Sequence, residues 1–243
     1  MLGILGAVGA ATFLTACENT NSAASKTSKT SLPDPLDPAR PESARSLVPE
    51  SSNNYVPPIA RQPLPPPPVA KEPANTYGIL PRSMWARSGP DLKRVDPMNG
   101  VKLITFHHSG DPKAFTTTDF GETAQHLEYV REYHRSRNFQ DIGYHFAIDR
   151  AGRVWQLRSL RYEGQHVRYN NEHNLGVVVL GNFDLQHMTQ AQKEKVKSFG
   201  LLLRKQYALP ISRVYTHQEI VKTECPGDDM QPYMVAIRKQ RLI

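Results

Sequence analysis

The chain has 243 residues, of which 39% are hydrophobic and 22% charged, so it is long enough for one hydrophobic core with further segments around it. Its 20 prolines exceed the roughly 5% share that is usual in proteins, and 13 of them lie between residues 33 and 73. The net charge of +7 falls entirely on residues 78–243, which hold 24 basic and 17 acidic residues. A basic folded domain favours a polyanion such as nucleic acid, anionic lipid or a cell-wall polymer. The only two cysteines lie in segments of opposite character, which argues against a disulfide framework.

The N-terminus predicts export. Residues 2–16 form an uncharged, mostly apolar run that is shorter than the roughly 20 residues of a membrane span and is typical of a secretory signal. The run ends in Leu14-Thr15-Ala16-Cys17, which resembles the lipobox of bacterial lipoproteins, so we expect residues 1–17 to be a lipoprotein signal peptide and Cys17 to carry the lipid. The alternative is an ordinary cleaved signal peptide in which Cys17 is incidental. Glu18 follows the cysteine, whereas the signal that retains lipoproteins at the inner membrane is usually Asp there, so we expect the protein in a bacterial cell envelope, at an outer membrane and facing the periplasm.

The segment that follows, residues 18–77, predicts a disordered tether. It begins rich in Ser, Thr, Asn and Ala and becomes rich in proline, a composition that buries too little apolar surface to fold. As extended polyproline, about 60 residues would reach on the order of 190 Å. That reach suits a domain held at a membrane that acts on a wall, and the alternative is a docking site for a proline-binding module.

Residues 78–243 predict a single domain of strands and helices. Strands are indicated by β-branched, aromatic or continuous apolar runs at 101–107, 142–149, 154–157, 175–180 and 212–215. Helices are indicated by apolar residues three and four apart at 117–137, 189–207 and 231–241. We therefore expect an α/β fold with a central mixed β-sheet flanked by helices, in which the second and third strands form a hairpin.

One histidine and the only cysteine of this domain lie close together in the sequence. His217 stands at the end of a predicted strand and Cys225 follows eight positions later across a loop, so both side chains can turn toward one point. Imidazole and thiolate together suit Zn²⁺, which takes three protein ligands in catalytic sites. The third ligand is expected from His107 or His108, and because neighbours on a strand point to opposite faces, only one of them enters easily. The alternative is a cysteine nucleophile at Cys225 with His217 as its base.

Four ordered blocks of this domain resemble one family. The chain is similar to the type 2 N-acetylmuramoyl-L-alanine amidases, which include the peptidoglycan recognition proteins and the lysozyme-like amidases of bacteriophages. The resemblance covers about residues 78–230 and rests on Phe106-His107-His108-Ser109, Asp141-Ile142-Gly143-Tyr144-His145-Phe146, Asn174-Leu175-Gly176-Val177 and His217 through Cys225-Pro226-Gly227. Arg82-Ser83-Met84-Trp85-Ala86 is similar to a motif of the recognition proteins.

The resemblance implies roles for individual residues. It makes His107, His217 and Cys225 the zinc ligands and Tyr144 and Thr223 the catalytic residues, and it matches His166 and Asn171 to residues of the substrate groove. The cytosolic recycling branch carries a catalytic Glu and a ligating Asp where this chain has Val178 and Cys225. The resemblance is therefore to the recognition-protein and phage branch, without a glutamate base.

The implied activity is zinc-dependent hydrolysis of the amide bond between N-acetylmuramic acid and L-alanine, in cell-wall remodelling or recycling, with peptidoglycan or muropeptides as partners. The alternative is a peptidoglycan-binding module without catalysis, and Cys225 favours the enzyme because binding-only members commonly lose that ligand. A nucleic-acid partner ranks third, because no known motif accompanies the charge and the export signal argues against it. The sequence says nothing of oligomeric state. Among the other histidines, we expect two to be packed or hydrogen-bonded in the interior, His108 and His145, and four to lie at the surface, His126, His134, His173 and His187.

Overall fold

The computed structural model describes residues 77–243. The signal peptide expected at residues 1–17, the lipid site at Cys17 and nearly all of the tether expected at 18–77 lie outside the described residues. No helix within residues 77–243 has the length and apolar character needed to cross a membrane.

A five-stranded sheet forms the centre of the fold, in the spatial order β3-β2-β4-β1-β5. β1 pairs in parallel with β4 and β5, and β4 pairs in parallel with β2. β3 is antiparallel to β2, with which it forms the expected hairpin. The mixed sheet predicted from the sequence is confirmed, and its strands are β1 (Leu103–His108), β2 (Phe146–Ile148), β3 (Val154–Gln156), β4 (Asn174–Val179) and β5 (Val214–Thr216).

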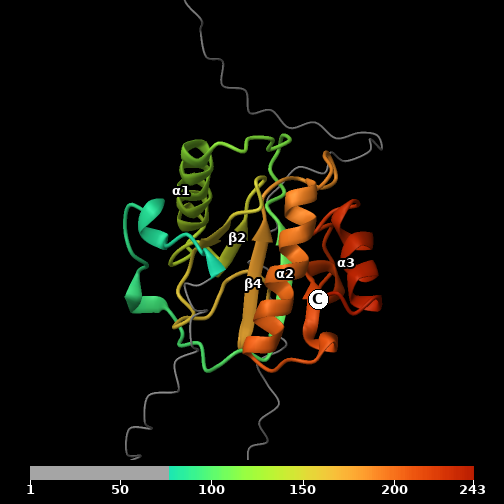
Figure 1. The fold of residues 1–243 in the computed structure, drawn as a ribbon. Helices are drawn as coiled ribbons and strands as arrows, with labels where there is room; N and C mark the ends of the chain where they lie inside the picture. Colours follow the sequence, from blue (N-terminus) through green and yellow to red (C-terminus); the bar gives the residue numbers. More distant parts are fainter. Residues whose placement is uncertain (1–76) are drawn as a thin grey trace, which may run out of the picture.

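Three α-helices flank the sheet, and their ends follow from local chemistry. α1 (Phe120–Ser136) begins after Asp119, whose carboxylate accepts a hydrogen bond from the backbone N–H of Glu122 at 2.8 Å. α2 (Gln190–Gln206) begins with a capping box in which Thr189 and Gln192 each bond the other's backbone N–H. α3 (Met230–Lys239) follows the loop that carries the cysteine. Figure 1 shows α2 crossing in front of β4, with α3 beside it.

The two faces of the sheet carry different side chains. One face packs against α2 and α3 in a continuous apolar cluster that includes Phe106, Val177, Phe199 and Met234. The other face packs against α1 in a second, smaller cluster that includes Leu127 and Val178. Because successive side chains of a strand alternate between faces, the residues next to Phe106 in β1 point toward the α1 side.

The structure differs from the sequence-based expectation at the start of the hairpin. The strand predicted from residue 142 begins only at Phe146, and Tyr144 and His145 precede it outside any strand. This segment is still tied to its neighbours, because the backbone N–H of His145 donates to the carbonyl of Gly176 and the N–H of Arg158 donates to the carbonyl of Tyr144. Tyr144 is therefore fixed at the edge of the sheet.

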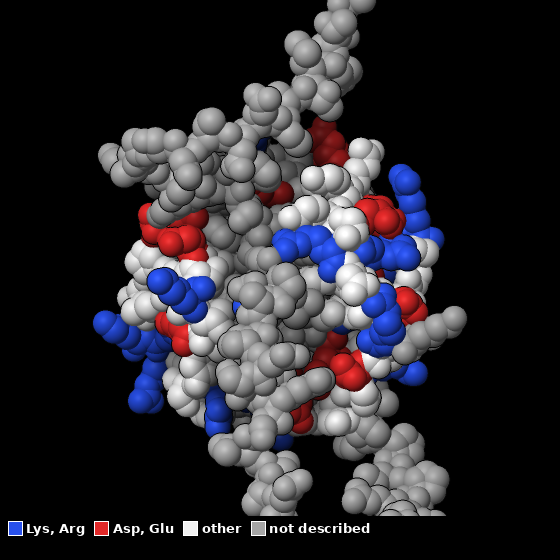
Figure 2. All heavy atoms as spheres, turned by 180° about the vertical axis from the view of Figure 1, so that it is seen from behind, with Lys and Arg blue, Asp and Glu red and all other residues white. Residues whose placement is uncertain are grey.

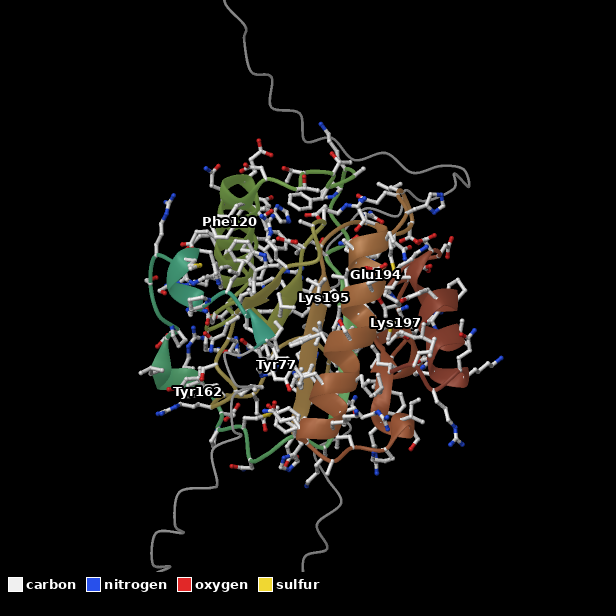
Figure 3. All side chains as sticks on the ribbon, viewed as in Figure 1. Tyr77, Phe120, Tyr162, Glu194, Lys195 and Lys197 are labelled. Carbon is white, nitrogen blue, oxygen red and sulfur yellow. The ribbon has the colours of Figure 1, made fainter. Side chains whose placement is uncertain are left out.

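Many charged side chains within residues 77–243 lie on the outside, although some, such as Arg131, Asp141 and Arg158, are buried. On the face drawn in Figure 2, Lys and Arg are interspersed with Asp and Glu. Figure 3 shows Glu194, Lys195 and Lys197 along the outer side of α2, where Glu194 is exposed and the two lysines are partly exposed.

Candidate metal centre

β1 delivers His107 to the α1 side of the sheet. Phe106 packs into the apolar cluster under α2 and α3, and the alternation of the strand turns His107 to the opposite face, where it is completely buried. His108 turns the other way, and its ring Nδ1 accepts a hydrogen bond from the backbone N–H of Phe183 at 3.3 Å. Only His107 of this pair reaches the centre.

Parallel pairing brings His217 next to His107. Phe106 of β1 lies beside Thr216 of β5, so the residues that follow them are neighbours, and the two imidazole rings lie 4.6 Å apart between centroids. His217 opens a short 3-10 turn, His217–Glu219. This turn is held in place because Glu219 accepts a hydrogen bond from the backbone N–H of Thr216 at 2.8 Å and forms an ion pair with Arg238 of α3.

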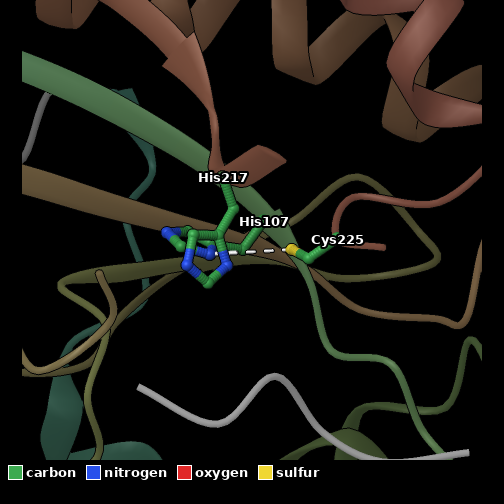
Figure 4. Close-up of side chains that lie close together, drawn as sticks. All are labelled: His107, His217 and Cys225. Carbon is green, nitrogen blue, oxygen red and sulfur yellow. Dashed lines mark hydrogen bonds between the residues drawn. The ribbon is translucent and has the colours of Figure 1, made fainter. Parts of the chain in front are cut away.

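The loop before α3 supplies Cys225, which is 1% exposed. Its carbonyl accepts a hydrogen bond from the backbone N–H of Gln218 at 2.9 Å, which joins the loop to the turn that carries His217. Its sulfur accepts a hydrogen bond from the backbone N–H of His108 at 3.4 Å and lies 3.7 Å from Nδ1 of His107. The end of β1 and the segment from His217 to Cys225, which are far apart in the sequence, therefore meet at one point (Figure 4).

The donor atoms at this point fit a zinc ion. One atom from each of His107, His217 and Cys225 lies within 4.8 Å of the other two, and no other group of this kind occurs among residues 77–243. Both ring nitrogens of His217 are buried and have no hydrogen-bond partner among the described residues. A buried polar atom without a partner is costly, and a neutral imidazole has one N–H and one nitrogen with a lone pair, so His217 keeps a lone pair that a metal ion can bind. Two imidazoles and one thiolate are a donor set that Zn²⁺ binds, with a fourth position left for water or substrate.

Burial sets the protonation of the three side chains. It lowers the pKa of His107 well below the usual value, with a further decrease from the neighbouring His217 and His166, and it lowers the pKa of His217 to about 4. Both imidazoles are therefore neutral at neutral pH and keep a lone pair for a metal. Burial raises the pKa of the Cys225 thiol, and the His108 N–H opposes that increase. A bound cation removes the proton from a coordinating thiol, so metal binding and thiol ionisation occur together.

Tyr144 and Thr223, the two predicted catalytic residues, both lie beside the metal ligands. The ring of Tyr144 lies 5.1 Å from that of His107 between centroids. Burial, reinforced by Cys225, raises the pKa of Tyr144 well above its usual value, so its hydroxyl keeps its proton. The hydroxyl of Thr223 accepts a hydrogen bond from the backbone N–H of Cys225 at 3.3 Å, and its side chain is partly exposed.

Of His166 and Asn171, the predicted substrate-binding residues, the structure places His166 against the candidate metal ligand His107, and Asn171 holds the backbone around His166. His166 is 1% exposed, and its Nδ1 lies 3.0 Å from Nε2 of His107. The amide oxygen of Asn171 accepts hydrogen bonds from the backbone N–H groups of His166 and Val167, each at 2.9 Å. Contact of His166 and Asn171 with substrate stays a prediction, whereas the contact of His166 with His107 is part of the fold.

The remaining histidines divide into buried and exposed ones. His145 is buried as expected, with its Nδ1 accepting from the N–H of Gly176 and its Nε2 donating to the carbonyl of Tyr162. The surface position expected for His134 is wrong, because its ring is 2% exposed and accepts a hydrogen bond from the N–H of Gly143 at 3.0 Å. His126 is also largely covered, since it stacks on Phe115 and lies 3.2 Å from a carboxylate oxygen of Asp111.

Comparison with known families agrees with this geometry. The profile of the N-acetylmuramoyl-L-alanine amidase family matches residues 97–228, a stretch that contains all three candidate metal ligands. The match covers more than half of the chain, so the chain belongs to the N-acetylmuramoyl-L-alanine amidase family.

Individual relatives are similar over the same region. Human N-acetylmuramoyl-L-alanine amidase is 30% identical over 162 residues, which are 62% of this chain and 26% of the human protein, so the chain matches about a quarter of that relative's length. A peptidoglycan-recognition protein of Drosophila melanogaster is 28% identical over 155 residues, which are 61% of this chain and 81% of that protein. A solved structure of a Drosophila PGRP-LB variant in complex with tracheal cytotoxin has a TM-score of 0.54 at 24% identity and covers 62% of this chain and 90% of its own. This structural match shows a shared fold.

Proposed function

We propose that the protein is a zinc-dependent peptidoglycan hydrolase that cleaves the amide bond between N-acetylmuramic acid and the L-alanine of the stem peptide. The observation that carries the proposal is the three-donor centre of His107, His217 and Cys225, with two unpaired His217 nitrogens and with Tyr144 beside it. Membership of the amidase family supports the choice of reaction, because the family profile spans all of these residues.

In the proposed amide hydrolysis, individual residues of the protein have distinct roles. A bound Zn²⁺ supplies a water of lowered pKa and polarises a carbonyl. Tyr144 stays protonated because burial raises its pKa, so its hydroxyl donates a hydrogen bond to the carbonyl oxygen on which negative charge develops. A hydrogen-bond donor of this kind contributes about 2.7–4 kcal/mol to transition-state stabilisation in a measured case.

Thr223 acts as an orienting residue in this scheme. Its hydroxyl oxygen already accepts the N–H of Cys225, which leaves the hydroxyl proton free to be donated toward the water or the substrate carbonyl. A hydroxyl is too weak a base to be the sole proton acceptor, so we assign Thr223 to orientation.

The substrate we propose is anionic peptidoglycan or its muropeptides. The net charge of +7 on the chain favours an anionic polymer. Among the relatives, one is named a peptidoglycan-recognition protein, and one solved structure holds tracheal cytotoxin. Remodelling of the wall or recycling of its fragments are the processes that such a reaction serves.

We further propose that the protein works from a membrane of the bacterial cell envelope. The lipobox-like sequence at Cys17 supplies a lipid anchor, residues 18–77 supply a tether, and residues 78–243 form the amidase domain. Glu18 favours the outer membrane, with the domain in the periplasm.

A second candidate function is recognition of peptidoglycan without cleavage. It is favoured by the similarity to proteins named as recognition proteins. The presence of Cys225, with its sulfur buried against His107, favours the enzyme.

Mass spectrometry of muropeptides incubated with the purified protein tests the two candidates against each other. We expect release of stem peptides that begin with L-alanine, loss of that release with a chelator, and its return when zinc is added. Binding of muropeptides by the zinc-loaded protein without any cleavage would contradict the hydrolase and leave the recognition module.

A further inference from the structure

We propose that His166 is a positioning residue that fixes the tautomer of His107, so that Nδ1 of His107 offers its lone pair to the metal. This inference rests on the metal centre of the proposed function, but it concerns a hydrogen-bonded chain formed by the protein's own residues. This hydrogen-bonded chain runs from the carbonyl of Asn174 through His166 to His107, with donor–acceptor distances of 3.1 Å and 3.0 Å.

The direction of each hydrogen bond follows from its partner. The carbonyl of Asn174 has no proton, so Nε2 of His166 must carry one and donate it. A neutral imidazole has one donor and one acceptor nitrogen, so Nδ1 of His166 is an acceptor. It therefore receives the proton on Nε2 of His107. That leaves Nδ1 of His107 unprotonated, and this is the nitrogen that faces the sulfur of Cys225 at 3.7 Å.

The fold holds both the Asn174 end and the His166 loop of this hydrogen-bonded chain. Asn174 is the first residue of β4, where it lies beside Leu103 of β1, and its side chain accepts a hydrogen bond from the Thr105 hydroxyl at 2.8 Å. The loop that carries His166 is fastened by Asn171, whose amide oxygen accepts from two successive backbone N–H groups. The carbonyl that starts the chain is thus part of the central sheet.

Two glycines leave the space that the ring of His166 fills. A Cβ atom on Gly176, in the middle of β4, would lie 2.6 Å from the Cδ2 atom of His166, and one on Gly164 would lie 2.3 Å from the same atom. Real Cβ atoms do not approach so closely, so any side chain at either position would displace the ring. The glycine in an otherwise apolar strand therefore has a function in the site.

The burial of His166 favours a positioning role over direct contact with substrate. His166 is 1% exposed, and both of its ring nitrogens already have partners, so no polar atom of its ring remains for a ligand. Partners of this kind orient ligating histidines in metal sites, and their loss costs about 10–100-fold in metal affinity or activity.

The first test is nitrogen NMR of the imidazoles in the metal-free protein. We expect His107 and His166 both to carry their proton on Nε2. A spectrum in which His107 carries its proton on Nδ1 would overturn the inference. This readout needs neither zinc nor catalysis, so it remains decisive if the proposed function fails.

The second test compares zinc affinities by competition with a chelator. His166→Leu removes the acceptor, and we expect zinc binding to weaken about 10–100-fold. His166→Asn keeps an amide oxygen near the position of Nδ1, and we expect affinity within about threefold of the unchanged protein, since the acceptor is retained.

The control is His134→Leu, which removes another buried histidine that bonds the backbone but makes no described hydrogen bond to a metal ligand. We expect it to lower stability and to leave the zinc affinity of the folded protein unchanged. Equal weakening by His134→Leu and His166→Leu, or no rescue by His166→Asn, would show a general packing effect and overturn the positioning role.

Discussion

The two faces of the central sheet use the same strands for different purposes. On the face covered by α2 and α3, the inward residues of β1 and β4 other than His108 are apolar and form one continuous cluster. On the face covered by α1, the same strands contribute His107 and the open space at Gly176, which His166 fills. The first face mainly stabilises the fold through apolar contacts. The second face also contains the candidate site, whose buried polar side chains are held by hydrogen bonds.

The second face itself contains two kinds of buried histidine. His134 and His145 bond backbone groups, so their positions are explained by the fold alone. His217 has no hydrogen-bond partner for either ring nitrogen within residues 77–243, so the fold alone does not explain its burial. The difference makes His217 a candidate ligand residue rather than one whose burial is explained by packing.

The largest expected effect comes from removing the sulfur ligand. Cys225→Ala leaves two imidazoles, too few for a catalytic zinc site. We expect zinc affinity to fall by more than the roughly 100-fold that marks loss of a supporting partner, and amidase activity to fall to that of chelator-treated protein. Chelator competition and the muropeptide assay measure the two losses. Full activity in the variant would contradict the assignment of Cys225 as a ligand.

The next effect tests catalysis without metal binding. Tyr144→Phe removes one hydroxyl from a ring that is 2% exposed, so the packing stays intact. We expect kcat to fall by about 10²–10³ while zinc affinity is unchanged, because the hydroxyl acts on the oxyanion. Steady-state kinetics and chelator competition separate the two. A rise in KM with unchanged kcat would point away from this role.

A substitution that creates a cavity tests the face of the sheet covered by α2 and α3. Leu203 of α2 is completely buried in the cluster on the far side of the sheet from the metal ligands. We expect Leu203→Ala to lower the free energy of unfolding by about 2–5 kcal/mol, measured by urea denaturation. Zinc affinity of the folded protein should not change. A parallel loss of both properties would show that the two faces are not independent.

The smallest expected effect concerns pH. Burial lowers the pKa of His134 to about 3, below the roughly 6.5 of an unfolded chain, so the unfolded state binds an extra proton between these values. The stability from neutral His134 is therefore complete above about pH 6.5 and is lost as the pH falls toward 3. We expect His134→Leu to make the pH dependence of unfolding shallower by about 1.4 kcal/mol per pH unit between pH 4 and 6.

Urea denaturation of metal-free protein at several pH values measures this slope. Tyr129→Leu changes a 60% exposed residue of the same helix and serves as the control, with no expected change in slope. An unchanged slope for His134→Leu would show that His134 is charged in the folded protein.

Much of the fold is readable from the sequence because its elements have strong periodic patterns. The helix expected at 189–207 is observed at Gln190–Gln206, and the strand expected at 175–180 at Asn174–Val179. The spacing of Leu127, Val130 and His134 already places that histidine on the apolar side of α1, so its burial had a signal in the sequence. Residue type alone predicts a surface position for His134, and its place on the apolar side of the helix overrides that preference.

The contact between His107 and His166 is harder to predict from the sequence. His107 and His166 are 59 positions apart, and their contact depends on the register of β4 and on the fold of a loop, neither of which a local pattern determines. The one signal was Gly176 within a run of apolar residues, since a glycine inside a strand often marks close approach of another group. The resemblance to a family predicts the three ligands. His217 and Cys225 alone are also compatible with a cysteine nucleophile and its base.

X-ray absorption spectroscopy of the zinc-loaded protein tests the central claim most directly. We expect one sulfur and two imidazole ligands around zinc in the unchanged protein, and loss of the sulfur contribution in Cys225→Ala. A spectrum without a sulfur ligand in the unchanged protein would contradict this claim, because the metal would then lie somewhere other than between His107, His217 and Cys225.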